Sequence, residues 1–340
     1  MLSTNSRQIK KPKACILLLT LGCTLRCKMC NLWLNDETKT IRPTLDQWKK
    51  FITSLAEFSG PGLNIIFGGG EPLLFPDTLI ELISFCRKYN LRTSLATSGY
   101  FINEEMAERL VSSGLDYIAL TLYSLNKDTH NFLRGMPDSY DRLMHAVKYL
   151  DGLHSKLEIA IDTVIMAPNL KEIIGLTEWV RQDARIRSIF LQAVVQPFHS
   201  LPLEDWHKSQ EYNFLWPKEI KETDSVIDDL IGLKESVPCG QRDKINNPIS
   251  QLRLFKSYFR NPADFVKKFN CNITGSEAFT VSPDGSINLC PYMPCVGNIR
   301  EADIVQILHS QEAGLRRQEI SLCKKNCHHI INCWYEEEGL

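Results

Sequence analysis

Hydrophobic runs that alternate with helix-like segments dominate the first part of the chain. Six short runs rich in apolar and β-branched residues are bounded by polar or turn-forming residues, as buried strands are. The runs are CILLLT from Cys15, NIIFGG from Asn64, RTSLATS from Arg92, YIALTLY from Tyr117, LEIAIDTVI from Leu157 and SIFLQAVV from Ser188. The segments between them have the period of amphipathic helices, so the pattern predicts six successive strand–helix units.

Several polar residues mark where the helices are expected to begin. Thr44 with Gln47, and Asn169 with Glu172, have the three-residue spacing of a capping box. Asp77 and Asn103 are expected as simple N-caps of two other helices, because a short side-chain oxygen can accept from a free backbone N–H of the first turn.

Strands that alternate with helices build a parallel sheet through right-handed crossovers. The sequence therefore predicts an α/β fold, a partial (β/α)6 TIM-like barrel over residues 14–235, since six units are fewer than the eight of a closed barrel. The remainder, residues 236–340, is expected to be a small cysteine-rich domain. In it, SQLRLFKSYF from Ser250 predicts a helix, and VSPDGSINLC from Val281 predicts a hairpin.

Charge and composition narrow the class of partner and compartment. Lysine and arginine number 39 against 40 acidic residues, a net charge of -1, so neither nucleic acid nor a membrane is expected as a partner. The longest apolar run, CILLLTLGC, is shorter than the roughly 18 residues of a membrane helix. The first ten residues hold no apolar signal core, so we expect a cytoplasmic protein. Because thiols are kept reduced in the cytoplasm, the 12 cysteines favour metal binding over a disulfide framework.

Unusual motifs follow each of the first three predicted strands. CTLRCKMC (residues 23–30) follows the first, GGGEP (68–72) the second and TSG (97–99) the third. The carboxyl ends of barrel strands meet on one face, and that face carries the active site of barrel enzymes. The convergence of these motifs predicts an enzyme with its site there.

Cys23, Cys27 and Cys30, the N-terminal cysteines, are expected to bind a metal cofactor. Their short spacing allows one loop to wrap around a cubane-sized cluster and direct three sulfurs at it. A structural zinc site is the alternative, but zinc needs a fourth protein ligand, and the neighbouring sequence has no further Cys or His. An incomplete set of protein ligands suits a metal that binds an exogenous molecule, which favours an iron–sulfur cluster.

With this CxxxCxxC motif after its first strand, the chain resembles the radical S-adenosylmethionine superfamily over roughly residues 14–235. In that family the three cysteines ligate three irons of a [4Fe–4S] cluster, and the amino and carboxylate groups of S-adenosylmethionine bind the fourth. The resemblance implies that Cys23, Cys27 and Cys30 are the catalytic cluster ligands. Met29 stands where the family usually has an aromatic residue beside the adenine.

GGGEP resembles the second motif of the family, in which exposed backbone and a glutamate hold the methionine amino group. Glycines at 68–70 allow a ligand to approach the backbone, and Glu71 can accept from an ammonium, whereas read alone the motif is a turn. The resemblance implies that Arg134 contacts the cofactor, and the alternative is that it forms an ordinary surface ion pair. His130 is expected at a helix start or on the surface. The cofactor-binding residues implied by the resemblance are Met29, Gly69, Gly70, Glu71, Thr97, Ser98, Thr121, Arg134 and Thr163.

The C-terminal cysteines resemble those of the SPASM and twitch extensions, which carry auxiliary iron–sulfur clusters. The later cysteine block is shorter than in a full two-cluster domain, so the resemblance implies one auxiliary [4Fe–4S] cluster. Its expected ligands are Cys271, Cys290, Cys323, Cys327 and Cys333. Zinc held by Cys and His is the alternative. We expect Cys295 to ligate nothing, and Cys15 and Cys86 to be buried in the core. Cys239 is expected to be an ordinary loop thiol; the alternative, from the resemblance, is a thiol that returns a hydrogen atom.

The resemblance implies a radical SAM Fe–S oxidoreductase that reductively cleaves S-adenosylmethionine to a 5′-deoxyadenosyl radical, which removes a hydrogen atom from the substrate. An electron donor such as flavodoxin or ferredoxin is then required. The auxiliary cluster favours oxidative modification of a peptide or protein, bound directly in a groove or through a separate peptide-recognition protein. One alternative is dehydrogenation, epimerisation or decarboxylation of a small molecule such as a sugar or cofactor precursor. Another is a non-catalytic metal-binding adaptor.

Overall fold

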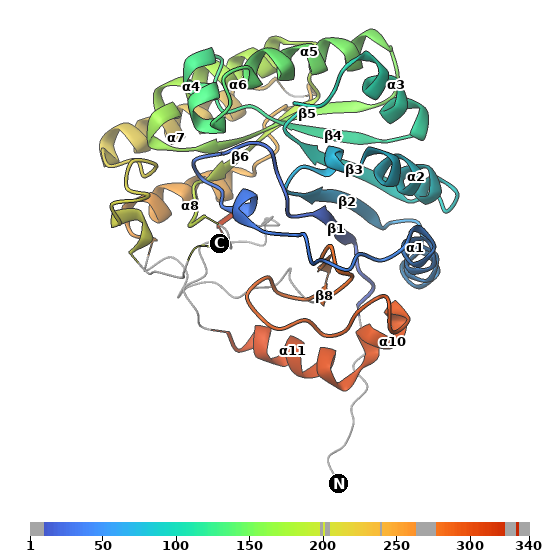
Figure 1. Ribbon diagram of the computed structural model, residues 1–340. Coiled ribbons are helices and arrows are strands. Elements are labelled where there is room, and N and C mark those ends of the chain that lie inside the picture. The colour runs from blue at the N-terminus through green and yellow to red at the C-terminus, as the bar shows by residue number, and fades with distance from the viewer. Residues whose placement is uncertain are drawn as a thin grey trace.

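The computed structural model describes residues 10–197, 200, 205–238, 240–262, 277–323 and 331–332 (Figure 1). All six predicted barrel strands are present, and consecutive strands pair in parallel, in the order β6-β5-β4-β3-β2-β1. The strands are β1 (Ala14–Thr20), β2 (Asn64–Gly69), β3 (Arg92–Thr97), β4 (Tyr117–Thr121), β5 (Glu158–Ile165) and β6 (Ser188–Ala193). Within the described residues β6 does not pair with β1, so the sheet is open and the barrel is partial, as predicted.

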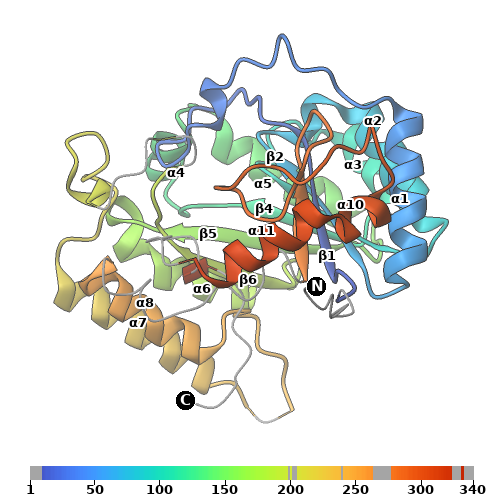
Figure 2. The ribbon, with the colours of Figure 1, turned by 90° about the horizontal axis from the view of Figure 1, so that it is seen from below.

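Helices cover the outer side of the curved sheet, as Figures 1 and 2 show from two directions. The helices of the barrel region are α1 (Leu45–Ser59), α2 (Pro76–Arg87), α3 (Glu104–Ser113), α4 (Lys127–Arg134), α5 (Ser139–Gly152), α6 (Ile173–Gln182) and α7 (Ile220–Glu235). Short 3-10 turns are η1 (Leu32–Leu34), η2 (Pro72–Leu74), η3 (Ala167–Glu172) and η4 (Trp206–Lys208). The expected domain boundary after residue 235 falls at the end of α7 and stays a prediction.

Two of the four predicted helix starts are confirmed. Thr44 and Gln47 form a reciprocal capping box at α1, and Asn103 accepts from the backbone of Met106 at α3. Asp77 lies inside the first turn of α2, whose N-cap is the preceding Phe75. The prediction for Asn169 is wrong, because its amide bonds the backbone of neighbouring strand ends and α6 begins only at Ile173.

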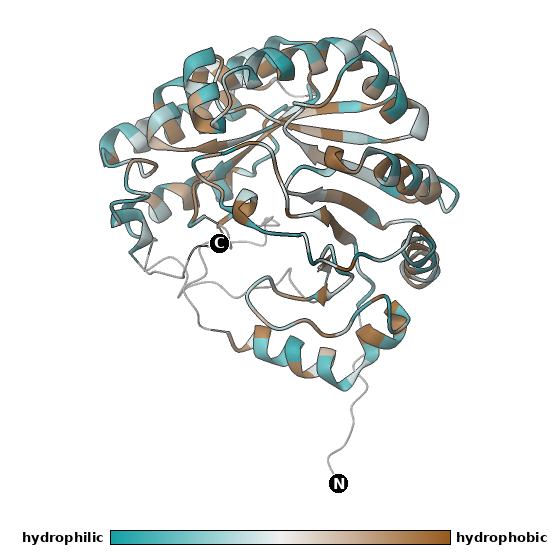
Figure 3. Ribbon diagram, viewed as in Figure 1, coloured by the Kyte–Doolittle hydropathy of each residue, from teal (hydrophilic) through white to brown (hydrophobic). Residues whose placement is uncertain are grey.

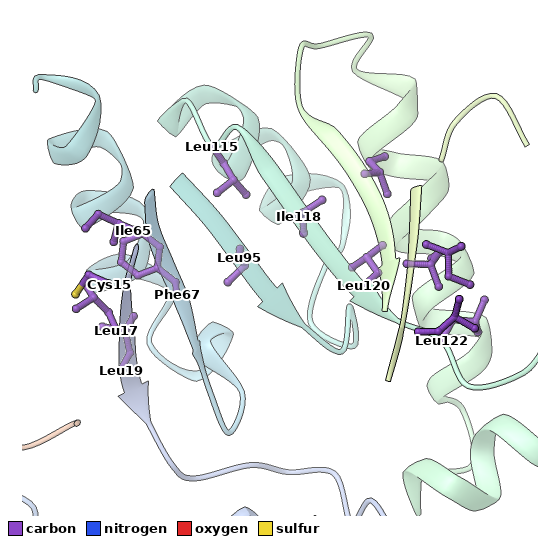
Figure 4. Close-up of a cluster of buried hydrophobic side chains, with 14 of the residues drawn as sticks. Cys15, Leu17, Leu19, Ile65, Phe67, Leu95, Leu115, Ile118, Leu120 and Leu122 are labelled. Carbon is purple, nitrogen blue, oxygen red and sulfur yellow. The ribbon is translucent and has the colours of Figure 1, made fainter. Parts of the chain in front are cut away.

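Alternate residues of each strand face opposite sides of the sheet, as strand geometry requires. On β1, Cys15, Leu17 and Leu19 are buried beneath the helices, whereas Ile16 and Leu18 face the inside of the barrel and remain partly exposed. Figure 4 shows the helix-facing side chains packed into one cluster, and Figure 3 shows that the strands are mostly hydrophobic. The expected burial of Cys15, and of Cys86 on α2, is confirmed.

The predicted C-terminal hairpin is present and extends the barrel sheet. Its strands β7 (Ala278–Val281) and β8 (Ile287–Asn288) are antiparallel, and β7 pairs in parallel with β1. Gly285 makes the turn at a φ of 88° that favours glycine, with its N–H donating to Ser282 at 2.8 Å. The pairing with β1 attaches the C-terminal region directly to the strand that precedes the cysteine motif.

Three helices complete the described part of the C-terminal region. The helix predicted from Ser250 is confirmed as α8 (Ile249–Arg260), and α10 (Ile304–His309) and α11 (Gln311–Ser321) follow the hairpin. The helix α10 packs on α1, where the rings of Phe58 and His309 lie 5.6 Å apart. Of the helices that the structure describes, none combines the length and apolar character needed to cross a membrane.

Candidate active site

The loop of residues 22–30, called the cysteine loop below, is held in place by the end of α4. The backbone N–H of Arg26 donates to the carbonyl of Arg134 at 3.0 Å, and the N–H of Lys28 donates to the carbonyl of Leu133 at 2.9 Å. These two bonds cross between segments more than 100 residues apart in sequence. They fix the loop beside the mouth of the barrel.

The N-terminal cysteines are close enough to affect one another electrostatically. Burial, with a smaller contribution from the charges of Cys27, Glu71 and Cys30, raises the pKa of Cys23 to about 12. Burial, together with Cys27, raises the pKa of Cys30 to about 11. The raised pKa values of Cys23 and Cys30 mean that these two thiols need a positive centre nearby to become thiolates, and iron in a cluster supplies that charge.

The cysteine loop therefore fits a cluster by the chemistry of its donors. Among the residues that the structure describes, no three His, Cys, Asp or Glu side chains are grouped for a single metal ion. A zinc ion would hold its sulfurs within roughly 4 Å of one another, given Zn–S bonds of about 2.3 Å. The thiols in this loop are thus not arranged as a finished single-ion site.

Arg134 is a buried side chain beside the cysteines. Only 6% of its surface is exposed, its guanidinium donates to Cys27 Sγ at 3.5 Å and to the carbonyl of Thr121 at 2.5 Å, and it lies 4.7 Å from the centre of the Tyr123 ring. Its Nε has no hydrogen-bond partner within the described structure. The alternative of a surface ion pair is wrong, because the guanidinium is enclosed by the end of β4 and the cysteine loop.

Glu71 ties the ends of β2 and β3 together. Its carboxylate accepts from Thr97 Oγ1 at 2.7 Å, from Ser98 Oγ at 2.5 Å and from the Ser98 backbone N–H at 3.1 Å. Glu71 is 1% exposed, and Thr97 and Ser98 are also buried. The three predicted residues therefore form one polar cluster, and their roles towards S-adenosylmethionine stay predictions.

Close packing against the backbone of the neighbouring loop requires glycine at two positions before Glu71, which the sequence did not suggest. A Cβ at Gly69 would lie 2.2 Å from the carbonyl oxygen of Thr20, and one at Gly70 would lie 2.1 Å from that of Gly22. Gly70 and Glu71 also donate their N–H groups to these same carbonyls, at 2.8 and 3.0 Å. At Gly68 a Cβ would meet nothing within 4 Å, so only this glycine leaves open space for a ligand.

Sequence reasoning missed Glu37, whose hydrogen bonds hold the start of the cysteine loop in place. Its carboxylate accepts from the backbone N–H of Leu21 at 2.7 Å and of Gly22 at 3.1 Å, and from the Thr20 hydroxyl. Arg42 pairs with the same carboxylate at 2.8 Å. In sequence Glu37 is one of several polar loop residues, and nothing local distinguishes it from a solvated one.

Asp162 was also missed, although it lies next to the predicted Thr163. Asp162 is on the inner side of β5, in register with Thr121 of β4 and Phe190 of β6. It is half-buried, and desolvation raises the pKa of this carboxyl to about 7. The signal available in the sequence was a single charged residue within an otherwise apolar strand.

Thr163, Met29 and His130, also singled out from the sequence, lie in three different environments. Thr163 is fully buried on the helix-covered side of β5, where its hydroxyl has no partner within the described structure. Met29 is partly buried and packs against the core. The surface position expected for His130 is wrong, because the ring is fully buried between Tyr123 and Tyr140 and its Nδ1 accepts from the Tyr123 backbone.

Only part of the predicted auxiliary site lies in the described chain. Cys290 is half-buried, two residues beyond β8, and Cys323 follows α11. Cys271, Cys327 and Cys333, and also Cys239, lie outside the described residues. Cys295 is exposed. The ligand set stays a prediction.

A cavity of about 660 Å³ separates the segment after the cysteine loop from the C-terminal hairpin. Glu37, Lys39 and Ile41 line one side, and Asp284, Asn288 and Arg300 line the other. Both walls are mixed in charge and rich in hydrogen-bonding groups. The space is large enough for several residues of an extended chain or for a small molecule.

Comparison with known proteins agrees with this fold. Residues 17–179 match the model of the radical SAM superfamily, and residues 271–334 match that of the SPASM iron–sulfur cluster-binding domain. The AdoMet-dependent heme synthase of Methanosarcina barkeri is 26% identical over 325 residues, 91% of this chain and 85% of that protein. The PqqA peptide cyclase of Rhizobium meliloti is 22% identical over 320 residues, 90% of this chain and 76% of that protein.

Solved structures with the same fold include two with other molecules bound. The anSMEcpe structure with AdoMet and the Cp18Cys peptide has a TM-score of 0.64 at 18% identity and covers 94% of this chain and 87% of its own. Streptococcus suis SuiB bound to precursor peptide SuiA has a TM-score of 0.64 at 16% identity, with coverage of 90% and 67%.

An open α/β barrel whose first strand leads into a loop with three neighbouring cysteines has the arrangement of an iron–sulfur enzyme. The chain belongs to the radical SAM superfamily and carries a SPASM domain in its C-terminal part. Such domains imply binding of S-adenosylmethionine and [4Fe–4S] clusters, while the alternative of a non-catalytic adaptor is not supported.

Proposed function

We propose that this enzyme uses S-adenosylmethionine to modify a peptide or protein oxidatively. When bound together, the cluster and S-adenosylmethionine supply a 5′-deoxyadenosyl radical that removes a hydrogen atom from the substrate. The observation that carries the proposal is the cysteine loop, whose thiols lie near enough to interact electrostatically with one another, with Glu71 and with Arg134, which also contacts Cys27.

The residues around the loop would each support this reaction in a defined way. Cys23, Cys27 and Cys30 would hold the cluster, and Arg134 would offset the negative charge of the thiolates from its buried position. Glu71 would orient an ammonium group, with Thr97 and Ser98 fixing its carboxylate. The remaining cofactor positions proposed are Met29, Thr121 and the backbone of Gly69 and Gly70, whereas Thr163 is not proposed because it faces the helix-covered side of β5.

A peptide substrate is favoured by the printed functions of relatives and by the cavity. PqqA peptide cyclases are among the relatives, and the anSMEcpe and SuiB structures contain peptides. The cavity between the segment after the cysteine loop and the hairpin has both apolar side chains and hydrogen-bonding groups on its walls, which suits an extended chain with alternating side chains. An auxiliary cluster held by Cys271, Cys290, Cys323, Cys327 and Cys333, and reduction by flavodoxin or ferredoxin, complete the proposal.

A small-molecule substrate is the second candidate, and one observation favours it. The relative with 26% identity over 91% of this chain is a heme synthase, so a tetrapyrrole is the small molecule to test first. Relatives with peptide and tetrapyrrole functions share the same fold, so fold alone does not choose between them.

A paired assay separates the two substrate classes. The reconstituted, reduced enzyme is incubated with S-adenosylmethionine and either iron coproporphyrin III or a library of short synthetic peptides. We expect 5′-deoxyadenosine together with a mass loss in one peptide. A mass change in the porphyrin alone would favour the second candidate, and neither change with either probe would contradict both substrate assignments.

A further inference from the structure

The cavity between the segment after the cysteine loop and the hairpin lies next to the start of the cysteine loop. Leu21, which lines the cavity, directly follows β1 and stands two residues before Cys23. In Figure 1 the two walls are the blue segment that follows η1 and the orange hairpin labelled β8. Among the residues that the structure describes, the charged ones that line these walls are Asp36, Glu37, Lys39, Asp284 and Arg300. Their existing partners decide which kind of ligand the cavity can take.

The acidic side chains of the cavity already have donors on their own walls. Glu37 accepts from backbone N–H groups at the start of the cysteine loop and pairs with Arg42 at 2.8 Å. Asp36 accepts at 2.9 Å from the backbone N–H two residues further on. Asp284 accepts from the backbone N–H of Ser286 at 3.0 Å and from its hydroxyl at 2.8 Å. Each of the three carboxylates thus helps to shape the loop that carries it.

Arg300 differs from these acids, because only part of its guanidinium is used. Its Nε donates to Asn298 Oδ1 at 3.2 Å, and its backbone N–H donates to the same oxygen at 2.9 Å. Asn298 is buried and is itself fixed, since its amide donates to the carbonyl of Asp284 at 3.0 Å. Within the described part of the chain, the two terminal amino groups of Arg300 form neither a hydrogen bond nor an ion pair. The guanidinium is therefore anchored at one nitrogen and free at the other two.

Lys39, on the other wall, is a second cation without a partner. It is exposed, and its ammonium forms no ion pair with any described residue. A guanidinium that is anchored at Nε can still bind a carboxylate through its two terminal amino groups, by two parallel hydrogen bonds. A cationic ligand would be repelled by Arg300 and Lys39, and it would find every carboxylate of the described walls already bound to a donor. The cavity therefore fits a ligand that carries a carboxylate.

We propose that Arg300 is a specificity-determining residue that binds a carboxylate of the peptide substrate in this cavity, with Lys39 as a second cationic contact from the opposite wall. The inference rests on the proposed function in taking the cavity as the substrate site. An acidic side chain and the C-terminus of a peptide both present a carboxylate, and the arrangement of donors fits either source. The experiment below distinguishes the two.

The test measures peptide binding to the reconstituted full-length protein without a reductant, so that no S-adenosylmethionine is cleaved. A library of short synthetic peptides with amidated C-termini is passed over the immobilised protein, and the retained peptides are sequenced by mass spectrometry. A second library has free C-terminal carboxylates. We expect acidic side chains to be enriched among the retained amidated peptides. Retention only from the second library would assign the contact to the peptide C-terminus.

Arg300→Gln should remove this preference. For the best-retained peptide we expect the dissociation constant to rise at least about tenfold. Binding of the matched peptide, in which an amide replaces the carboxylate, should stay unchanged, whereas a purely structural effect would weaken both peptides equally. Arg300→Lys keeps the charge but loses the planar fork, so its effect should be intermediate. Lys39→Gln, at an exposed side chain, should weaken binding about twofold and serves if Arg300→Gln misfolds.

Arg253→Gln is the matched control, because it removes the same charge from an exposed position on α8 that does not line the cavity. Equal weakening by the Arg253 and Arg300 variants would overturn the inference. Retained peptides without a preference for carboxylates would also overturn it, as would a parent protein that retains no peptide from either library. Failure of the proposed function is distinct, because it appears as missing 5′-deoxyadenosine in the reduced protein, whereas this binding requires no cleavage.

Discussion

Single polar side chains hold together backbone segments from different strands at the candidate site. Glu71 joins the ends of β2 and β3, and Glu37 joins the segment after the cysteine loop to the end of β1. Each carboxylate accepts from several donors, an arrangement that orders the loops that donate. The geometry of the cysteine loop thus depends on two carboxylates, Glu37 and Glu71, that are not among the predicted cluster ligands.

Replacement of Glu37 by Ala should loosen the cysteine loop. The change leaves the N–H groups of Leu21 and Gly22 without this acceptor and removes the partner of Arg42. We expect the free energy of unfolding to fall by about 2 kcal/mol, and iron to be lost faster from the N-terminal cluster. Denaturant unfolding and chelator kinetics measure the two effects. Asp36→Ala is the control, because Asp36 is exposed and accepts from the backbone N–H of Thr38, two residues further on. Equal effects of both changes would refute this role of Glu37.

Asp162 should make the stability of the protein depend on pH. Desolvation raises the pKa of this carboxyl to about 7, above its usual value near 4, so the folded protein keeps the proton between these pH values while the unfolded chain releases it. Stability from this group is therefore lost progressively as the pH rises from about 4 to about 7. Asn cannot ionise, so Asp162→Asn should be more stable than the parent at pH 8 by up to about 4 kcal/mol, with the difference vanishing towards pH 4.

Urea unfolding of both proteins at several pH values tests this prediction. Asp151→Asn on the exposed face of α5 is the control and should leave the pH dependence unchanged. Parallel pH curves for the parent and Asp162→Asn would show that Asp162 titrates normally.

At the scale of elements, the C-terminal end of α4 and the cysteine loop form one unit. The helix ends at Gly135, whose φ of 61° lies in the left-handed region, and the two backbone bonds from the loop reach the preceding residues. A Cβ at Gly135 would lie 2.4 Å from the carbonyl oxygen of Arg26. Glycine is needed here for both the turn and the close approach of the loop.

Gly135→Ala should therefore displace the cysteine loop as well as strain the end of the helix. We expect a loss of at least about 2 kcal/mol in the free energy of unfolding, with lower 5′-deoxyadenosine formation per bound cluster. The control is Gly152→Ala on α5, where a Cβ meets no heavy atom within 4 Å and φ is not positive. That change should be neutral or stabilising by about 0.5 to 1 kcal/mol. Normal nucleoside formation in the Gly135 variant would contradict the coupling.

At the scale of the whole molecule, the sequence predicted the parts that depend on local patterns. The six strands, the α1 capping box and the hairpin at Gly285 follow from short-range periodicity and turn chemistry. The pairing of β7 with β1 and the bond between Asn332 and Ala193 join residues far apart in the chain, and no local pattern encodes them. The same limit hid Glu37, which became visible only when the loop backbone was in place.

Anaerobic reconstitution tests the central claim most directly, with the parent protein compared against the variant in which Cys23, Cys27 and Cys30 are Ala. Both are reduced in the presence of S-adenosylmethionine, and iron, sulfide and 5′-deoxyadenosine are measured. We expect nucleoside from the parent only, with about four irons retained in the variant by the auxiliary site. Equal 5′-deoxyadenosine from both proteins would contradict the assignment of the active site to the cysteine loop.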